Sequence, residues 1–432
     1  MKRALICGLF FVLSMYGFIT VAGAEHSYPR LGGYLISGPF SYDDPAYQRQ
    51  IAKLDMVILN MWPGWESSTS SREGVIANIK KLNPDIRAFQ YYDNNELASP
   101  APAPFRPVEQ KADEMGWWLY LNGGAGIRVN SAWQDFVSLN TTQFTPRDST
   151  GKNFLEWNAQ WVLDNYARPV PSSDGLFIDN VFWRPRINGD WNRDGTTDDK
   201  NSPTVQQWFR DGYKRYFSLL DAGQAGKYNL GNLADWGASE ANLTGYTNIV
   251  SGGVFEFAIG MGFSVESWAS YSDFLKFYRK IMANVATPKF VIFHQVGSGT
   301  DFQALRYGLA TCLMDDGYFH YAVEDKRNRV DWFDEFDHDL GMPLTAPPGA
   351  AWKDGVYRRD FKNGIALVNP KGNGTRTVQL DGTFRKILGT QDTAVNSGQT
   401  VTQVTLRDRD GLILLRNTSA SKPVPPSGVR VD

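Results

Sequence analysis

Asp174-Gly-Leu-Phe-Ile-Asp179-Asn180 is a short apolar segment that ends in a carboxylate and an amide, and its pattern recurs along the chain. Seven more apolar runs end in polar or aromatic residues, and amphipathic stretches with helical spacing follow several of them. These runs lie at residues 33–37, 56–60, 86–90, 228–232, 253–257, 290–294 and 309–313. Strands that alternate with helices predict an α/β fold, here a (β/α)8 barrel. A doubly wound sheet is the alternative, but no glycine-rich nucleotide-binding turn follows the first run.

The chain of 432 residues is long enough for more than one domain. Four closely spaced prolines at 100–107 and a glycine-rich turn after them predict an insertion at about 93–150, on the third strand-to-helix connection. After a proline-rich linker, five short strands predict a small all-β sandwich, with Asn363-Gly364 and Asp381-Gly382 as hairpin turns. The predicted parts are a signal peptide (1–24), a barrel (25–342), a linker (343–350), a β-sandwich (351–416) and a disordered tail (417–432).

The N-terminal segment has the pattern of an export signal. Lys2 and Arg3 precede an uncharged apolar run, and the small residues up to Ala24 follow it. We expect cleavage after Ala24 and a secreted or periplasmic protein without stable membrane association, with an uncleaved anchor as the alternative. Cleavage would remove Cys7 and leave Cys312 without a partner for an internal disulfide.

Charge and composition exclude several classes of function. Lysine and arginine total 44 against 46 for aspartate and glutamate, so no basic surface for nucleic acid is indicated. Four histidines are too few to favour a His-rich metal site, and we interpret His294 and His320 as core residues because no G-x-S-x-G motif accompanies them. The aromatic share of 14% exceeds what a core needs. We expect a monomer whose partner is a carbohydrate substrate.

Two isolated carboxylates are the candidates for catalysis. Catalytic residues of a barrel lie at the C-terminal ends of strands, and alternation places Asp179 on the same face as Phe177, toward the barrel axis. Glu256 lies within an apolar run, where burial would raise its pKa, as a general acid requires. The structural alternatives are an Asp179 that caps a loop or binds Arg184, and a Glu256 paired with a neighbouring cation.

Most glycoside hydrolases require two carboxylic acid side chains on either side of the bond that is cleaved. We expect Asp179 to act as the nucleophile of a retaining reaction and Glu256 as the acid/base. The sequence alone does not distinguish retention, with carboxyl groups about 5–5.5 Å apart, from inversion, with about 6.5–9.5 Å. Further carboxylates predicted at or just past strand ends are Asp93, Asp235, Asp315 and Asp316.

Aromatic and amide side chains follow several of the same strands. Flat rings pack on the apolar faces of sugars, and amides bond hydroxyl groups without adding charge. A single tryptophan packs in a core more often than it binds a ligand, and Trp157, Trp161 and Trp208 fit helix packing. The predicted carbohydrate-binding residues are Asn60, Trp62, Tyr92, Asp93, Asn180, Trp183, Asn232, Trp236 and Gln295.

The most specific local motif is Asp190-Trp-Asn-Arg-Asp-Gly-Thr-Thr-Asp198-Asp199. Oxygen ligands at positions 1, 3 and 5, with glycine at position 6, match an EF-hand-type loop, but position 12 is Asn201 instead of an acid. We expect a structural calcium ion that stiffens this loop and no organic cofactor. A solvated acidic turn is the alternative. The predicted ligands are Asp190, Asn192, Asp194, Thr196, Asp198 and Asp199.

Several segments resemble a known family. The segment that ends in Asp179-Asn180, together with Trp117-Trp-Leu-Tyr120 and Phe136-Val-Ser-Leu-Asn140, resembles a secreted bacterial family of hypothetical glycosyl hydrolases with a barrel and a C-terminal β-domain. The chain is more distantly similar to polygalactosaminidase-like barrels. The resemblance implies that Asp179 is a catalytic carboxylate, whereas the match around Glu256 is short. A glycoside hydrolase acting on a poly- or oligosaccharide is therefore expected, with a transglycosidase or a non-catalytic glycan-binding protein as alternatives.

Overall fold

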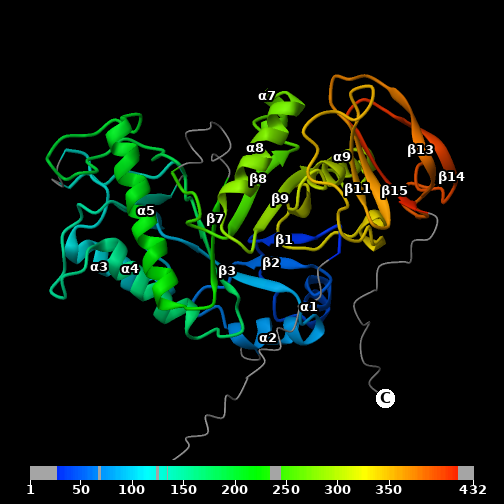
Figure 1. Ribbon diagram of the computed structural model, residues 1–432. Helices are drawn as coiled ribbons and strands as arrows, with labels where there is room; N and C mark the ends of the chain where they lie inside the picture. Colours follow the sequence, from blue (N-terminus) through cyan, green and yellow to red (C-terminus); the bar gives the residue numbers. More distant parts are fainter. Residues whose placement is uncertain (1–26, 67–69, 123–125, 134, 234–244, 417–432) are drawn as a thin grey trace, which may run out of the picture.

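The computed structural model describes residues 27–66, 70–122, 126–133, 135–233 and 245–416 (Figure 1). The predicted signal peptide, the predicted tail and two candidate residues, Asp235 and Trp236, lie outside the described residues.

Eight parallel strands form one sheet in the order β1-β2-β3-β6-β7-β8-β9-β10. The sheet closes on itself because Leu31 pairs in parallel with Phe319, whose amide donates to the Arg30 carbonyl at 2.8 Å. The predicted (β/α)8 barrel is therefore confirmed. The strands are β1 (Gly32–Leu35), β2 (Met56–Leu59), β3 (Arg87–Asp93), β6 (Gly175–Asp179), β7 (Tyr228–Asn232), β8 (Gly252–Ile259), β9 (Phe290–Gly297) and β10 (Tyr318–Val323).

One predicted strand is wrong. Residues 309–313 belong mostly to a helix, α9 (Phe302–Cys312), and the eighth strand is β10. Every residue of α9 from Ala304 to Cys312 is buried, because the barrel covers one side of the helix and β-strands of the C-terminal domain cover the other. A helix buried on all sides has no polar face, so its sequence cannot be told from that of a buried strand.

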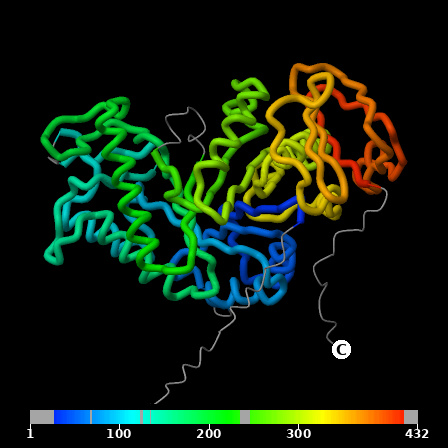
Figure 2. The backbone as a smooth tube through the Cα atoms, in the orientation of Figure 1, coloured from blue at the N-terminus to red at the C-terminus, as the bar shows by residue number. Residues whose placement is uncertain are grey.

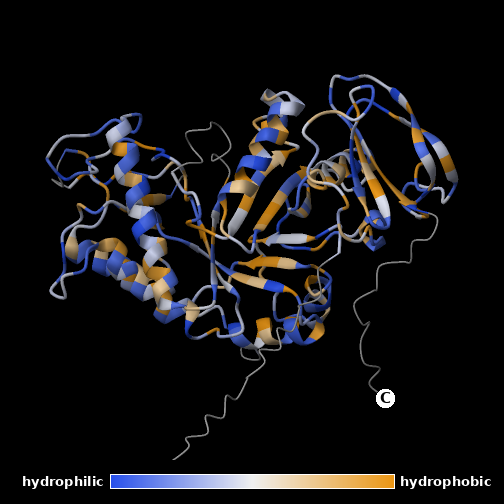
Figure 3. Cartoon of the chain, viewed as in Figure 1, coloured by the Kyte–Doolittle hydropathy of each residue, from blue (hydrophilic) through white to orange (hydrophobic). Residues whose placement is uncertain are grey.

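Helices cover the outside of the barrel, and hydrophobic residues concentrate on the strands that they enclose (Figure 3). Helical spacing after the strand runs is confirmed in the longest helix, where Tyr213, Phe217 and Leu220 lie on the buried side. No helix within the described residues is long and apolar enough to cross a membrane. Besides α9, the helices are α1 (Pro45–Ile51), α2 (Arg72–Leu82), α3 (Arg106–Met115), α4 (Phe154–Val162), α5 (Pro203–Gly223), α7 (Val265–Trp268) and α8 (Tyr271–Asn284).

Between β3 and α4 the chain leaves the barrel and forms a separate layer, here called the insertion (residues 94–153). It contains α3 and a two-stranded antiparallel sheet of β4 (Glu96–Ala98) and β5 (Phe136–Ser138). Antiparallel bridges join Tyr120 to Arg128 and Trp118 to Leu139. Figure 2 shows the insertion, in cyan, on the opposite side of the molecule from the C-terminal strands.

The C-terminal β-domain is a five-stranded antiparallel sheet in the order β11-β12-β15-β13-β14. One predicted hairpin turn is wrong, because Asp381 and Gly382 lie inside β13, at a register shift between Gln379 and Phe384. An Asp-Gly pair suits a bulge as well as a turn, since both need a locally bent backbone. The strands are β11 (Tyr357–Phe361), β12 (Gly364–Asn369), β13 (Arg376–Lys386), β14 (Thr400–Leu406) and β15 (Asp410–Arg416).

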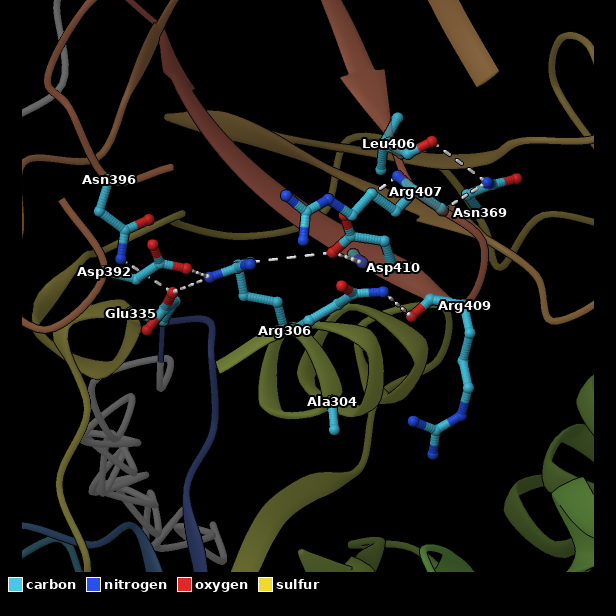
Figure 4. Close-up of polar contacts among 12 residues, drawn as sticks. Ala304, Arg306, Glu335, Asn369, Asp392, Asn396, Leu406, Arg407, Arg409 and Asp410 are labelled. Carbon is cyan, nitrogen blue, oxygen red and sulfur yellow. Dashed lines mark hydrogen bonds and ion pairs between the residues drawn. The ribbon is translucent and has the colours of Figure 1, made fainter. Parts of the chain in front are cut away.

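A buried ionic cluster connects α9 to the β-domain (Figure 4). The Arg306 guanidinium, 4% exposed, lies 2.7 Å from Asp392, 4.0 Å from Glu335 and 3.9 Å from Asp410. Gly411 follows on β15, where a Cβ atom would lie 2.2 Å from the Arg306 carbonyl oxygen. The strand therefore contacts the helix backbone directly, and the β-domain is fixed against the barrel.

Candidate active site

One amide group joins the two candidate catalytic carboxylates. Asn232, at the end of β7, donates Nδ2 to Asp179 Oδ1 at 2.9 Å and to Glu256 Oε2 at 2.8 Å. The two N–H bonds of a primary amide diverge by about 120°, so these carboxylate oxygens lie roughly 5 Å apart. The two carboxylates therefore lie close together at the barrel mouth.

Asp179 enters the barrel mouth because of its position on β6. Phe177 belongs to the cluster inside the barrel, and alternation puts Asp179 on the same face one step nearer the mouth. Its carboxylate also accepts hydrogen bonds from the Tyr91 hydroxyl at 2.5 Å and from the Asn180 amide at 2.7 Å. These donors fix the carboxylate and stabilise its charge.

Glu256 enters the mouth through a bulge in β8. The register of β8 against β9 shifts between Phe255 and Ile259, and Phe257 has a φ of 50°, which is rare for a bulky residue. The Arg327 Nη1 atom lies 2.7 Å from Glu256 Oε1, so Glu256 has the cation partner that the structural alternative described. Burial and the negative charge of Asp179 raise the pKa of Glu256, whereas Arg327 opposes part of the rise.

A second pair of acids lies beside Asp179. Asp93 is its register partner on β3 and accepts a 2.6 Å hydrogen bond from the Asn180 side chain. Burial, followed by the charges of Glu96 and Asp179, raises the pKa of Asp93 well above its usual range. Burial also raises the pKa of Glu96 to about 7.

Three inward-facing polar residues beneath the carboxylates were not predicted as site residues. The Tyr34 hydroxyl, His294 Nε2 and His320 Nδ1 are buried without a hydrogen-bond partner among the described residues. The two imidazoles are register partners, with ring centroids 5.2 Å apart, and burial lowers the pKa of His320 to about 3. Their alternation with the inward-facing Ile292 and Tyr318 is the signal that identifies them.

Four of the predicted sugar-binding residues line one cavity of about 350 Å³, which is open to solvent at the barrel mouth. The ends of β2 and β3 form one wall, and the insertion forms the other. The predicted residues on the cavity are Asn60, Trp62, Tyr92 and Asp93, and the structure adds Tyr91, Glu96, Leu97, Ala98, Pro102, Phe105, Val108, Phe136, Leu139 and Tyr166.

The prediction for Gln295 needs correction. Its side chain is buried on the outer face of β9 and donates to the Ala304 carbonyl at 2.8 Å. Side chains alternate along a strand, and it is the neighbouring His294 that faces the inside of the barrel. Tyr92 also points outward, where its ring packs on Trp161 and its hydroxyl accepts from Asn158, so it contributes only to the rear of the cavity.

Two other predicted groups have different surroundings. Trp183 is half-buried and packs on the Arg210 guanidinium, 4.2 Å from the ring centroid. Asp315 and Asp316 precede β10 and so lie at the opposite end of the barrel from the mouth, where Asp316 binds Arg359 at 2.7 Å. This correction follows from the misassigned strand at 309–313.

The predicted calcium loop forms a tight turn beside the insertion. The Asp190 carboxylate is buried and accepts from the amides of Asp194 and Gly195, both at 3.0 Å. The Asp198 carboxylate accepts from the Trp191 amide at 2.9 Å. Within the part of the chain that the structure describes, no three His, Cys, Asp or Glu residues are grouped to hold a metal ion. Calcium binding therefore stays a prediction.

A (β/α)8 barrel whose mouth holds two carboxylates within reach of one sugar has the architecture of a glycoside hydrolase. Residues 80–365 match the family described as "Hypothetical glycosyl hydrolase family 15", and the chain belongs to this family. The protein is thus a glycoside hydrolase.

Solved structures of glycoside hydrolases are among the proteins similar to this chain. A search of the curated proteins finds no match. Amy13B from Eubacterium rectale has 9% identity and a TM-score of 0.50, covering 90% of this chain and 95% of that one. The glycoside hydrolase domain of PelA from Pseudomonas aeruginosa has 12% identity and a TM-score of 0.40, covering 71% and 98% respectively. At such identities a likeness concerns the fold alone.

Proposed function

We propose that the protein hydrolyses a poly- or oligosaccharide with retention of configuration, with Asp179 as nucleophile and Glu256 as acid/base. The observation that carries the proposal is the shared Asn232 amide, which donates to one oxygen of each carboxylate and so holds the two groups close together, as a retaining mechanism needs.

The reaction has two steps. Asp179 attacks the anomeric carbon, the glycosidic C–O bond breaks, and Glu256 transfers its proton to the leaving oxygen. Glu256, now a base, then takes a proton from water, whose oxygen attacks the anomeric carbon and releases Asp179. The donors around Asp179 suit a charged nucleophile, and the raised pKa of Glu256 suits a group that must hold a proton.

A transglycosidase would use the same first step and differ only in the acceptor. Product analysis at high acceptor concentration separates the two activities. A glycan-binding protein without catalysis is less consistent with the geometry, because nothing in binding alone requires two carboxylates on one amide.

Two further parts of the proposal concern the setting of the enzyme. The N-terminal pattern supports export, so we expect the mature protein to act outside the cytoplasm as a monomer. The loop at 190–199 supports a structural calcium ion rather than a catalytic one, because its carboxylates bond their own backbone and not the mouth.

The test is a panel of soluble glycans with wild type, Asp179→Asn and Glu256→Gln. We expect Glu256→Gln to lose roughly 10²- to 10⁴-fold in kcat, and Asp179→Asn to show no turnover. Asp85→Asn, exposed at the opposite end of the barrel, is the matched control. Full turnover in both active-site variants would refute the proposal.

The roles are assigned separately. Glu256→Gln should retain activity on a dinitrophenyl glycoside, whose leaving group needs no proton. Asp179→Gly with azide should give a glycosyl azide of inverted configuration. The opposite pattern would exchange the two roles.

A further inference from the structure

Asp179 and Glu256 have different neighbours, and this difference indicates in which direction a sugar chain lies across the site. The cavity reaches the site on the side of Asp179, through Tyr91. Tyr91 lines the cavity, and its hydroxyl donates to Asp179 at 2.5 Å; Asp93, the register partner of Asp179, lines it too. A sugar that Asp179 attacks would therefore lie next to the cavity.

The cavity is built for a flat, largely apolar ligand with polar edges. Trp62, Phe105 and Phe136 contribute aromatic surface, and Asn60 supplies an amide beside them. Phe136 is 39% exposed although it lies on a strand of the insertion. Exposed aromatic surface in a concave site is typical of ligand contact.

On the side of Glu256 an exposed ring follows the bulge. Phe263 lies between β8 and α7, beyond the C-terminal end of β8, and is 62% exposed. Its ring meets Phe257 edge to face, with centroids 5.1 Å apart. Phe257 directly follows Glu256 and lies against the Arg327 guanidinium, 4.8 Å from the ring centroid. Phe263 is thus held in place near the acid/base by its contact with Phe257, while much of its side chain is exposed to solvent.

A general acid must lie on the side of the bond from which the leaving group departs, whereas the nucleophile faces the sugar that it attacks. Building on the proposed function, we propose that the cavity binds the glycone, that Phe263 supports the leaving-group sugar, and that the substrate is a glycan without negative charge. The enzyme would then recognise sugar units on both sides of the bond that it cleaves.

The exclusion of acidic sugars rests on the charge of the cavity. Its lining includes Asp93 and Glu96 and, among the described residues, no lysine, arginine or histidine. A uronic acid or sulfated sugar would place a negative charge beside two carboxyl groups in a partly buried cavity whose described lining has no compensating cation, which is unfavourable.

Binding tests this without relying on turnover. The Asp179→Asn protein is run in gels that contain galactomannan, β-glucan, starch or polygalacturonate. We expect retardation by at least one neutral polysaccharide and none by polygalacturonate. Adding Phe136→Ala or Phe263→Ala should weaken the retardation roughly 10-fold, whereas Trp352→Ala, an exposed tryptophan of the β-domain region, should not. Stronger retardation by polygalacturonate, or unchanged binding in both variants, would overturn the proposal.

Kinetics assign the two sides. A glycosyl fluoride has no sugar as leaving group, so Phe263→Ala should leave its hydrolysis unchanged and lower kcat/KM for the oligosaccharide. Phe136→Ala should lower both. The reverse pattern would overturn the assignment of sides. A failure of the proposed function would be recognised by a different result, namely retained turnover in Asp179→Asn. Melting temperatures show that each variant is folded.

Discussion

Tyr91 and Asp179, on neighbouring strands of the barrel, are joined by a 2.5 Å hydrogen bond in which the phenol donates to carboxylate Oδ2. The ring is held by stacking on Phe177, with centroids 5.7 Å apart. Burial and the charge of Asp179 raise the pKa of Tyr91, so the phenol keeps the proton that it donates. Tyr91 is thus a positioning residue for the nucleophile.

Tyr91→Phe keeps the stacked ring and removes the donor. We expect kcat/KM to fall roughly 10- to 100-fold, since a hydrogen bond to a charged group is lost, while the melting temperature changes little. Steady-state kinetics on a substrate from the glycan panel measure the effect. Tyr47→Phe is the control, because that hydroxyl is buried on α1 without a hydrogen-bond partner among the described residues. Full activity of Tyr91→Phe would show that Asp179 does not need this donor.

Arg327 influences the pKa of Glu256. Its positive charge opposes the rise in the Glu256 pKa, so Arg327→Met should raise that pKa further. Because the acid must be protonated to act, the alkaline limb of the kcat/KM profile should move to higher pH. Arg329→Met, at an arginine paired with Asp331 and 41% exposed, is the control. If the acidic limb moves instead, Glu256 acts as a carboxylate, and the roles are reversed.

Glu96 should make stability depend on pH. Burial raises its pKa from 4.5 to about 7, so the folded state favours the protonated form. The stability that this proton provides is present below pH 4.5 and is lost as the pH rises through about 7. Glu96→Gln imitates the protonated form. Its melting temperature should equal that of wild type at low pH and exceed it above pH 7, whereas the exposed Glu114→Gln should show no such trend. A constant difference at all pH values would contradict this account.

The sequence identified the two carboxylates because each is a single acid in an apolar strand, a pattern that needs no knowledge of the neighbours. It was harder to predict which residues of β3 and β9 face the inside of the barrel. Tyr91 and Tyr92 are equally aromatic, and His294 and Gln295 are both polar, so only the packing of Phe89 and Ile292 inside the barrel decides which of each pair faces the mouth.

Two other features depend on contacts far apart in the chain. The run at 309–313 is apolar on all sides because the β-domain covers α9. No local sequence pattern indicates that another domain packs on this helix. The cavity arises where the insertion approaches the ends of β2 and β3, so Phe105 and Phe136 could not be connected to the site from the sequence.

Calcium binding is testable through the loop at 190–199. If the ion binds the folded state, the melting temperature should be several degrees higher in calcium than in EGTA. Asp194→Ala should abolish that difference, because it removes a predicted ligand oxygen from an exposed side chain that accepts only from its own loop. Asp148→Ala is the matched control, since Asp148 also caps an exposed turn through backbone amides. Equal melting temperatures of wild type in calcium and EGTA would exclude a stabilising ion.

The junction between barrel and β-domain yields the last prediction. Arg306 is the buried cation among Asp392, Glu335 and Asp410, and removing one partner of a buried ion pair costs about 3–5 kcal/mol because the opposite charges stay uncompensated. Burial already raises the pKa values of Glu335 and Asp410, so Arg306→Met should favour their protonation. Its loss of stability in urea should therefore be large at neutral pH and smaller at acidic pH. Arg376→Met, at an exposed arginine on β13 of the same domain, controls for loss of charge. A loss of the same size at both pH values would mean that packing, and not charge, attaches the β-domain to α9.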